Sequence, residues 1–532
     1  MTRSSCLLAV NRRLAALPTE ILVEVLHLLD ETHTAICRLV CKRFEYIIGH
    51  NARLRYPLEL AAARYVDGHT EYPARAGTRL ELFKAQQEAW RKQDFRKRRT
   101  LDSSKYLYTP ASSAYRGGVL ALGVFNISIV TIPNLTPELT DLLRTIYINE
   151  LHIFYMCDFD LEPSQDLLVL WDSTSPNLHG LHMRFLSLRE GTPHKRARMS
   201  NLYMPIHHFF PENNPPDEFY VFDVNSVQLS GEYALLCANQ CRNVAVLNWV
   251  TGFHWVLAGS ACCMISNDCL IVADVHTNPP RFGVYRTAPS SQPPAVDLVR
   301  RYVLPKVADG ITTNIDCRHS PSYARQTLSP ETCAVPFATA PEAAMIVFSF
   351  RMRSPSLSAE DPDKQAALLC YTSRFLSETR SFVPREPSSD TVSPPEPEVE
   401  WESWGPDSSF LFGDVDNDDN VWSYALYGYR LMLERTLYDF NPHTIGASST
   451  EDGMEVCWGT SHPDTAQWFA QKIETHRPYM RARIDESKAP MSTTCFLVDE
   501  DVLALQDRTS DDDVGQVIIT QLTIGPSWED HP

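Results

Sequence analysis

The sequence predicts an α+β multidomain protein with a small N-terminal helical module, a helical connector and a large all-β body. Apolar residues recur at helical spacing in the first part of the chain, whereas short strand-like runs separated by turn signals dominate from residue 100 onward. The 532 residues also exceed one ordinary domain of about 100–200 residues. Strands do not alternate with helices, which argues against a parallel α/β core.

Composition narrows the classes of function. The formal net charge of −18 would repel phosphate backbones, so we expect no nucleic-acid partner. The 14 cysteines form no CxxC pair and often lie in apolar stretches, which indicates buried free thiols and neither metal nor cofactor. The N-terminal apolar run is too short for a signal peptide or a membrane span. We therefore expect a cytoplasmic or nuclear protein without membrane contact.

The helical module spans residues 14–50. Its first apolar stripe is followed by a polar break after Asp30. A second apolar set comes next, and we expect this second set to form two short helices split near Arg38–Leu39. So few residues rarely bury enough surface to fold alone. The module should therefore pack either against a partner helix or against the rest of the chain.

The same residues resemble a known motif. Leu17-Pro18-x-Glu20-Ile21-Leu22, then Leu28-Leu29-Asp30, then Leu39–Phe44 (LVCKRF) match the F-box pattern in order and spacing, except that Thr34 or Ala35 stands where the family usually has leucine. The resemblance implies binding to a Skp-type adaptor, and through it to a cullin. The adaptor-binding residues that it implies are Leu17, Pro18, Ile21, Leu22, Val25, Leu26, Val40, Cys41 and Phe44.

The connector spans residues 51–99. Residues 78–95 predict a helix with Leu80, Phe83, Gln87 and Trp90 near one face. The basic run Arg91–Arg99 has two interpretations: a solvated helix end, or a nuclear-import signal. In fungal F-box proteins a similar segment joins the box to a β-rich body.

The β-rich body spans residues 100–527. Predicted strands include 119–132, 181–185, 220–229, 233–238, 244–249, 253–257, 262–265, 269–275, 345–352, 366–373, 421–432, 454–459, 494–498, 502–505 and 515–524. A β-propeller and a double-sheet sandwich compete. Blades of about 40–45 residues would give six to eight blades, which favours the propeller. Residues 376–420 are rich in serine, proline and acidic residues and are predicted to be disordered or a long loop.

Two short strings strengthen the resemblance. Residues 246–252 (VLNWVTG) and 166–171 (DLLVLW) are similar to phrases of degenerate WD-type blades in fungal F-box proteins. The chain thus resembles F-box proteins of the fungal type with a C-terminal degenerate WD-like β-propeller body.

The function that this resemblance implies is non-catalytic. No GxSxG, P-loop, HExxH or GxGxxG motif is found, so we expect no enzyme. The leading hypothesis is a substrate-recognition subunit of a Skp–cullin–F-box ubiquitin ligase, which binds an unknown target protein through the β body. The alternatives are an F-box interaction scaffold without a degradation role, and an enzyme body with the box as a regulatory handle.

Overall fold

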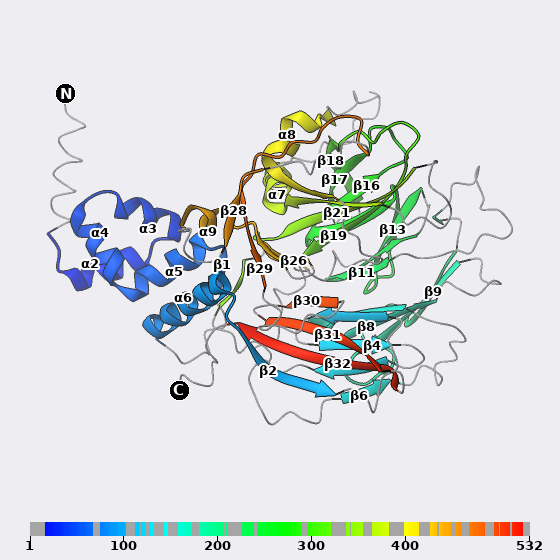
Figure 1. The fold of residues 1–532 in the computed structure, drawn as a ribbon, viewed down its shortest axis with the longest axis horizontal. Coiled ribbons are helices and arrows are strands. Elements are labelled where there is room, and N and C mark those ends of the chain that lie inside the picture. The colour runs from blue at the N-terminus through cyan, green and yellow to red at the C-terminus, as the bar shows by residue number, and fades with distance from the viewer. Residues whose placement is uncertain are drawn as a thin grey trace.

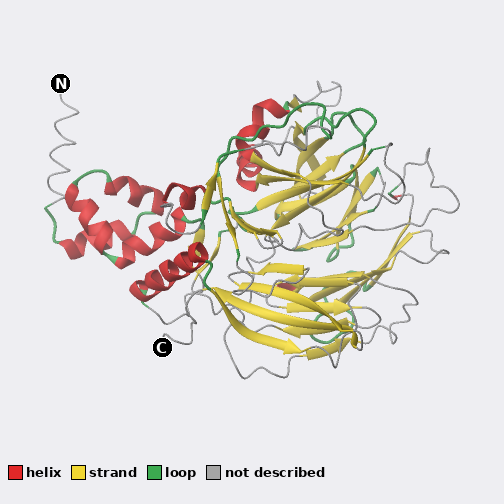
Figure 2. Ribbon diagram, viewed as in Figure 1, coloured by secondary structure: helices red, strands yellow, loops and turns green. Residues whose placement is uncertain are grey.

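Helices form the first part of the chain and strands form most of the rest (Figures 1 and 2). The computed structural model describes residues 16–67, 75–102, 112–116, 119–123, 127–131, 143–146, 158–172, 180–205, 208–209, 226–238, 242–288, 295–320, 337–340, 342–354, 364–381, 398–413, 426–433, 436–447, 454–459, 468–484, 494–498, 501–510 and 513–524. The helices gather in a lobe that projects from one side of the β body (Figure 1).

The lobe holds five helices and one short strand among its described residues. They are α2 (Thr19–His27), α3 (Glu31–Arg38), α4 (Lys42–His50), α5 (Ala52–Ala62), β1 (Tyr65–Asp67) and α6 (Ala76–Lys92). The break between α3 and α4 confirms the predicted split near Arg38–Leu39. The helix predicted over residues 78–95 begins and ends slightly earlier, because Gln93 adopts a left-handed conformation that terminates α6.

The body consists of seven sheets of four or five strands within the described residues. The first three are β3 (Ser112–Arg116), β4 (Val119–Gly123), β5 (Ile127–Thr131) and β6 (Leu143–Ile146); β7 (Asp158–Glu162), β8 (Leu167–Asp172), β9 (Gly180–Ser187) and β10 (Asn201–Pro205); and β11 (Ser226–Ser230), β12 (Tyr233–Cys237), β13 (Asn243–Asn248) and β14 (His254–Ala258). In each sheet the strands follow chain order and pair antiparallel.

The next three sheets carry insertions. They are β15 (Ala261–Ser266), β16 (Cys269–Asp274), β17 (Arg281–Ala288), β18 (Ala295–Val303) and β23 (Glu398–Val399); β19 (Thr312–Ser320), β21 (Met345–Arg353), β22 (Lys364–Tyr371) and β24 (Ser409–Gly413); and β25 (Leu426–Tyr427), β26 (Arg430–Leu433), β27 (Thr436–Asp439), β29 (Tyr479–Arg483) and β28 (Glu455–Cys457). The inserted elements are β20 (Phe337–Thr339), α7 (Thr372–Ser381), α8 (Trp401–Ser408) and α9 (Pro442–Ala447).

The seventh sheet joins the two ends of the body. It contains β30 (Thr494–Val498), β31 (Asp501–Ser510), β32 (Asp513–Ile524) and, as its outer strand, β2 (Phe95–Asp102). β2 pairs with β32 from Phe95↔Ile524 to Asp102↔Ile518, and β30 contacts β3 of the first sheet and β25 of the sixth. Seven sequential units of four or five strands, closed by an early strand, are the topology of a β-propeller. The double-sheet sandwich is therefore wrong, and the number of blades falls within the predicted six to eight.

The predicted strands lie where the pattern placed them, with local differences. Within the predicted 119–132 the structure describes the strands β4 and β5, and within 220–229 it describes β11 from Ser226; residues 124–126, 132 and 220–225 lie outside the described residues. In β9 the predicted alternation holds, with Leu181, Met183 and Phe185 buried and His182 exposed. The strands β12, β15 and β16 are buried almost throughout, because each lies between two neighbouring sheets.

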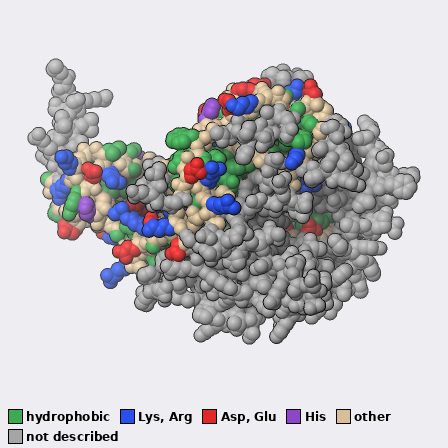
Figure 3. Space-filling model, viewed as in Figure 1, with side chains coloured by type: hydrophobic (Ala, Val, Ile, Leu, Met, Phe, Trp, Pro, Cys, Tyr) green, Lys and Arg blue, Asp and Glu red, His purple; other side chains and the backbone are tan. Residues whose placement is uncertain are grey.

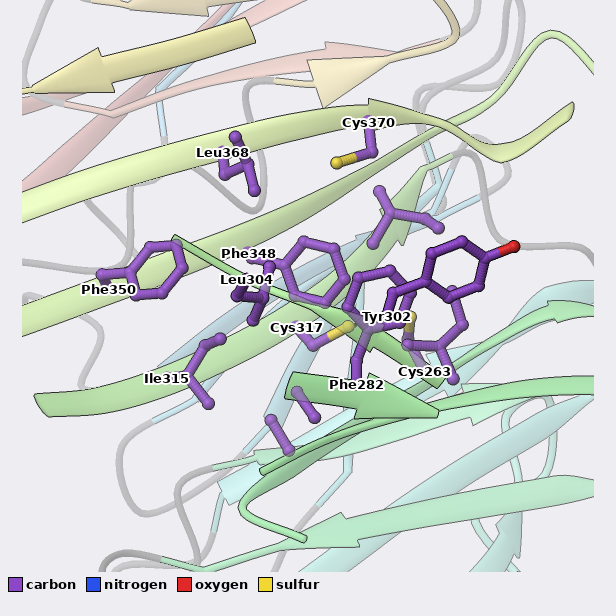
Figure 4. Close-up of a cluster of buried hydrophobic side chains, with 14 of the residues drawn as sticks. Cys263, Phe282, Tyr302, Leu304, Ile315, Cys317, Phe348, Phe350, Leu368 and Cys370 are labelled. Carbon is purple, nitrogen blue, oxygen red and sulfur yellow. Dashed lines mark hydrogen bonds between the residues drawn. The ribbon is translucent and has the colours of Figure 1, made fainter. Parts of the chain in front are cut away.

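The core is a series of apolar layers between adjacent sheets. The largest lies between the fourth and fifth sheets, where Phe282 of β17 stacks on Tyr302 of β18 at 5.0 Å and contacts Phe348 of β21 at the same distance (Figure 4). The thiols of Cys263 and Cys317 lie 3.0 Å apart in this layer. The predicted buried free thiol is thus confirmed for Cys263, and Cys317 is a second buried free thiol beside it.

One prediction about the body is wrong in part. Residues 376–420 were expected to be disordered or a loop, yet they contain the end of α7, all of α8 and the strand β24. Trp401 and Trp404 of α8 are buried, and the Trp404 indole donates a hydrogen bond to the Val303 carbonyl at 3.0 Å. The serine, proline and acidic bias lies mainly in residues 382–397 and 414–425, which are outside the described residues, whereas the aromatic anchors flank them.

The strand order defines two rims of the ring. Successive antiparallel strands alternate in direction, so connections between sheets lie at one end of the strands, together with the second-to-third hairpins. We call this end the inter-sheet rim. The first-to-second and third-to-fourth connections lie at the opposite end, and they include β20 and α9, which contact the lobe. The inter-sheet rim therefore faces away from the lobe.

Candidate adaptor-binding surface

The helices α2, α3 and α4 form a compact unit with its own small core. Asp30 caps α3 by accepting a hydrogen bond from the His33 backbone N–H at 2.8 Å, which fixes the turn after α2. The guanidinium of Arg43 donates to the Leu17 carbonyl at 2.7 Å and so holds the start of α4 against the start of α2. The buried side chains of this core are Leu22, Val23, Leu26, Phe44, Ile47, Ile48 and Leu54.

The outer side of the unit is apolar although it faces solvent. Leu28 and Leu39 are each 85% exposed, and the whole set is Ile21, Val25, Leu28, Leu29, Ile36, Leu39 and Val40. We call this set the apolar surface. Seven large hydrophobic side chains are exposed in α2, in α3 and in the turns that follow these two helices, which is more than isolated surface leucines would explain, and such exposure is typical of a protein-interaction site.

The nine residues implied by the F-box resemblance all lie in this unit, but in different environments. Leu22, Leu26 and Phe44 are buried in its core, and Leu17 and Cys41 are half-buried against that core. Pro18, Ile21, Val25 and Val40 are exposed. The structure therefore separates residues that build the unit from residues that a partner can touch.

The adaptor-binding residues implied by the resemblance did not include four exposed residues: Leu28, Leu29, Ile36 and Leu39. A helical-face analysis of α2 would have found part of this set. Ile21, Val25 and Leu28 recur at spacings of four and three on one face, whereas Leu22 and Leu26 lie on the next. Leu39 follows the end of α3, where helical periodicity gives no guide.

Of the two residues that can stand where the family usually has leucine, Thr34 is buried and Ala35 is exposed. Thr34 in α3 is almost fully enclosed, and its hydroxyl donates a long hydrogen bond of 3.5 Å to the Leu26 carbonyl. Threonine at this position therefore contacts the inside of the unit and not the apolar surface. Ile36, two positions further along α3, is exposed.

A charged hollow borders the unit on the side of the body. It has a volume of about 650 Å³ and lies between α4, α5 and α9, with Arg38, Lys42, Glu45, Arg55 and Glu59 among its lining residues. Lys and Arg side chains also gather over α5 and α6 on the face drawn in Figure 3. Charged side chains thus border the three-helix unit on the side that faces the body.

The lobe joins the body through a paired strand. β1 of the connector pairs antiparallel with β20 of the fifth sheet, from Tyr65↔Thr339 to Asp67↔Phe337. Tyr65, Phe83 and Phe337 pack edge-to-face around this pair at ring separations between 5.0 and 5.9 Å. The Asn441 side chain of the sixth sheet also donates to the Ala63 carbonyl at 3.0 Å.

Arg430 of β26 is the polar centre of the same junction. It is almost fully buried, and it donates to the Tyr65 hydroxyl at 2.9 Å and to the Gln87 side chain at 3.0 Å. Its guanidinium lies 4.4 Å from the ring centre of Trp90, and its Nε lies 3.6 Å from a carboxylate oxygen of Asp439. Burial raises the pKa of Asp439, and the nearby Arg430 opposes that rise. These contacts fix the lobe to the body as one unit.

The basic run Arg91–Arg99 is divided between two elements. Arg91 and Lys92 end α6 and form ion pairs with Glu88, as cations at a helix C-terminus commonly do. From Phe95 the run continues as β2, so the first body strand starts inside the segment predicted as connector. The import signal stays a prediction.

Metal ligands do not cluster in the described part of the chain. No group of three or more His, Cys, Asp or Glu side chains there could hold a metal ion. His208 directly follows His207 in the sequence, and its ring stacks on that of His254 with the ring centres 5.1 Å apart. Among the described helices, none has the length and apolar character needed to cross a membrane.

Comparisons with known proteins agree with this arrangement. The F-box-like family profile matches residues 14–56, which covers the three-helix unit and the start of α5. No curated protein matches the chain.

Solved structures give matches of low similarity. The WD40 domain of Toxoplasma gondii coronin is 8% identical with a TM-score of 0.32, and the match covers 81% of this chain and 87% of that domain. The β-propeller domain of Myceliophteria thermophila Cps50 (Swd1) is 10% identical with a TM-score of 0.33, covering 79% and 99%. U3-55K is 8% identical with a TM-score of 0.28, covering 70% and 80%. Scores this low carry no argument of their own, and the propeller assignment rests on the strand topology. The chain thus carries an F-box-like domain at residues 14–56, joined to an all-β body of propeller topology.

Proposed function

We propose that this protein is the substrate-recognition subunit of a Skp–cullin–F-box ubiquitin ligase. The observation that carries the proposal is the apolar surface on a three-helix F-box-like unit, which nothing in the described part of the chain covers. A Skp-type adaptor would bury this surface and connect the chain to a cullin.

The protein itself performs no bond chemistry in this proposal. It holds a target near a ubiquitin-loaded enzyme and so raises the effective concentration of the target's lysines. The junction around Arg430 supports this role, because hydrogen bonds and packed rings join the lobe to the body without a flexible linker. The complex would operate in the cytoplasm or the nucleus.

The target would bind at the inter-sheet rim. This rim lies at the end of the strands opposite the lobe, so a protein bound there would not collide with an adaptor on α2 and α3. Connections at propeller rims commonly carry binding residues, because the strands beneath hold them in place.

Co-purification with a Skp-type adaptor and a cullin tests the proposal. The informative variant is Ile21→Asp/Val40→Asp, because both side chains are half exposed and contribute little to the core of the unit. Burying the exposed half of each side chain would contribute about 0.8–1.5 kcal/mol, so the double variant should weaken adaptor binding by a factor of about 10–10² through lost burial alone, and burying the two carboxylates would weaken it further. The matched control is Val256→Asp on β14, an exposed apolar residue of the body.

The outcomes separate the hypotheses. Capture of adaptor and cullin by the native chain and the control, but not by the double variant, supports the receptor. Capture of adaptor without cullin supports the scaffold without a degradation role. Equal adaptor binding by the native chain and a folded double variant would show that the apolar surface is not the interface.

A further inference from the structure

Arginine greatly outnumbers lysine in this chain. The sequence contains 38 arginines and 10 lysines. The difference is largest between residues 106 and 305, where 11 arginines accompany a single lysine, Lys195. This stretch builds the first four sheets of the body, from β3 to β18.

The fold needs arginine at some of these positions. Arg116 donates to the Leu229 carbonyl and to the Asp160 carboxylate, and it lies 3.7 Å from Glu162. The guanidinium of Arg196 lies 5.4 Å from the centre of the Trp249 ring while it pairs with Glu232. A lysine ammonium has neither the planar fork nor the stacking face that these contacts use.

At other positions lysine would serve the fold equally well. Arg189 is 73% exposed, and its nearest carboxylate, that of Asp166, lies 4.0 Å away. Arg300 makes one ion pair, with Glu378 at 3.3 Å, while its side chain is nearly half exposed. Exposed single-contact pairs of this kind contribute little stability with either cation.

Arg242 gives the clearest case. It is exposed at the start of β13, on the inter-sheet rim, and no carboxylate of the described chain lies within ion-pair distance of it. Neither packing nor charge pairing therefore requires a guanidinium at this position.

The chemical difference between the two cations is nucleophilicity. In ubiquitin transfer, the lysine Nζ attacks the thioester that joins the ubiquitin C-terminus to the conjugating enzyme. An isopeptide bond forms, the thioester breaks, and the proton lost by the amine compensates the released thiolate. Arginine keeps the positive charge but stays protonated and does not act as this acceptor.

We infer that arginine in place of lysine on the first four sheets keeps this receptor from being modified in place of its target. The inference rests on the proposed function, because a receptor is held near ubiquitin-loaded enzyme as closely as the target it presents. Lys195, whose side chain is 87% exposed, is then the one acceptor that this part of the body offers.

The test is self-ubiquitination of the full chain in a reconstituted complex with adaptor, cullin, RING subunit, conjugating enzyme and ubiquitin. The variant is Arg189→Lys/Arg242→Lys/Arg300→Lys, which raises the lysines of residues 106–305 from one to four. Ubiquitin attached within this stretch, counted by mass spectrometry, should rise about fourfold, with the added modification on the new lysines. The matched control is Arg189→Gln/Arg242→Gln/Arg300→Gln, which removes the same guanidinium groups without adding amines and should stay at the native level.

Each outcome decides one point. A rise with the lysine variant alone supports the inference. No rise in a complex that assembles and modifies other lysines of its subunits overturns the inference and leaves the proposed function intact. An equal rise with the glutamine control also overturns it, because lost arginine contacts would then cause the modification. If the native chain does not enter the complex, the proposed function itself fails.

Discussion

Replacing Arg430 with methionine should loosen the lobe from the body. Methionine has a similar length but cannot make the ion pair with Asp439 or the hydrogen bonds to Tyr65 and Gln87. Removing one partner of a buried ion pair typically costs about 3–5 kcal/mol. Loss of the cation–π contact between Arg430 and Trp90 should destabilise the junction further. We therefore expect a local destabilisation of about 3–5 kcal/mol, centred on the junction.

Hydrogen exchange measures this effect locally. A cost of about 3–5 kcal/mol should speed exchange of the amides of β1 and α6 by a factor of about 10²–10⁴, as far as their native protection allows. The matched control is Arg351→Met on β21, because Arg351 is exposed and no described carboxylate pairs with it. Exchange in β1 and α6 that stays within threefold of the native rate would refute the assignment of Arg430 as the centre of the junction.

The same variant has a predictable pH dependence. The folded-state pKa of Asp439 lies above its ordinary value of 3.8 because of burial, and loss of Arg430 should raise it further. Between the unfolded and folded pKa values the folded state binds more protons, so the free energy of opening falls as pH rises. The destabilisation by Arg430→Met should therefore be smaller near the ordinary pKa and grow toward neutral pH. Adding Asp439→Asn, which removes the unpaired charge, should restore part of the protection at neutral pH.

Two further predictions concern the body. Trp404→Ala should lower the thermal unfolding midpoint by several degrees, since a buried tryptophan truncation costs about 3–5 kcal/mol, whereas Trp458→Ala, at a side chain that is 71% exposed, should change it little. Equal midpoints for the two variants would contradict the role of α8 in the core. Burial also raises the pKa of Glu162, with Arg116 opposing, so its ionisation should reduce the free energy of unfolding as pH rises above the ordinary value of 4.5. Glu162→Gln should weaken this pH dependence in urea denaturation, and parallel curves for variant and native protein would contradict it.

Local patterns predicted much of the secondary structure. The break between α3 and α4 follows from the change in apolar spacing near Arg38, and β9 follows from its alternation of Leu181, Met183 and Phe185 with polar residues. Both depend on neighbours within a few positions. Composition was a poorer guide, since the acidic, proline-rich bias around residues 376–420 concealed the helix anchored by Trp401 and Trp404.

The division of the F-box residues could be predicted only in part. The motif gives the set but not which members face outward, because Ile21 and Leu22 are equally apolar and adjacent. Their difference in exposure arises from the way in which α4 and α5 pack against α2. The junction was still less accessible, because Arg430 contacts Gln87 and Tyr65, which lie 343 and 365 positions away in the chain. No periodicity or local motif connects residues so far apart.

The place where the lobe joins the body determines how the two parts are held relative to each other. The lobe contacts the body where the fifth and sixth sheets expose β20 and α9, and the strand that follows α6 closes the ring as β2. The chain that carries the F-box-like unit is thus also the chain that completes the body, and the lobe cannot swing away without breaking the pairing of β1 with β20 and the hydrogen bonds of Arg430. A partner on the apolar surface and a target on the inter-sheet rim would accordingly stay at a fixed separation. A fixed separation would favour ubiquitin transfer to target lysines that lie at one distance from the partner. A flexible linker would instead let the lobe and the body take many relative positions in which no transfer occurs.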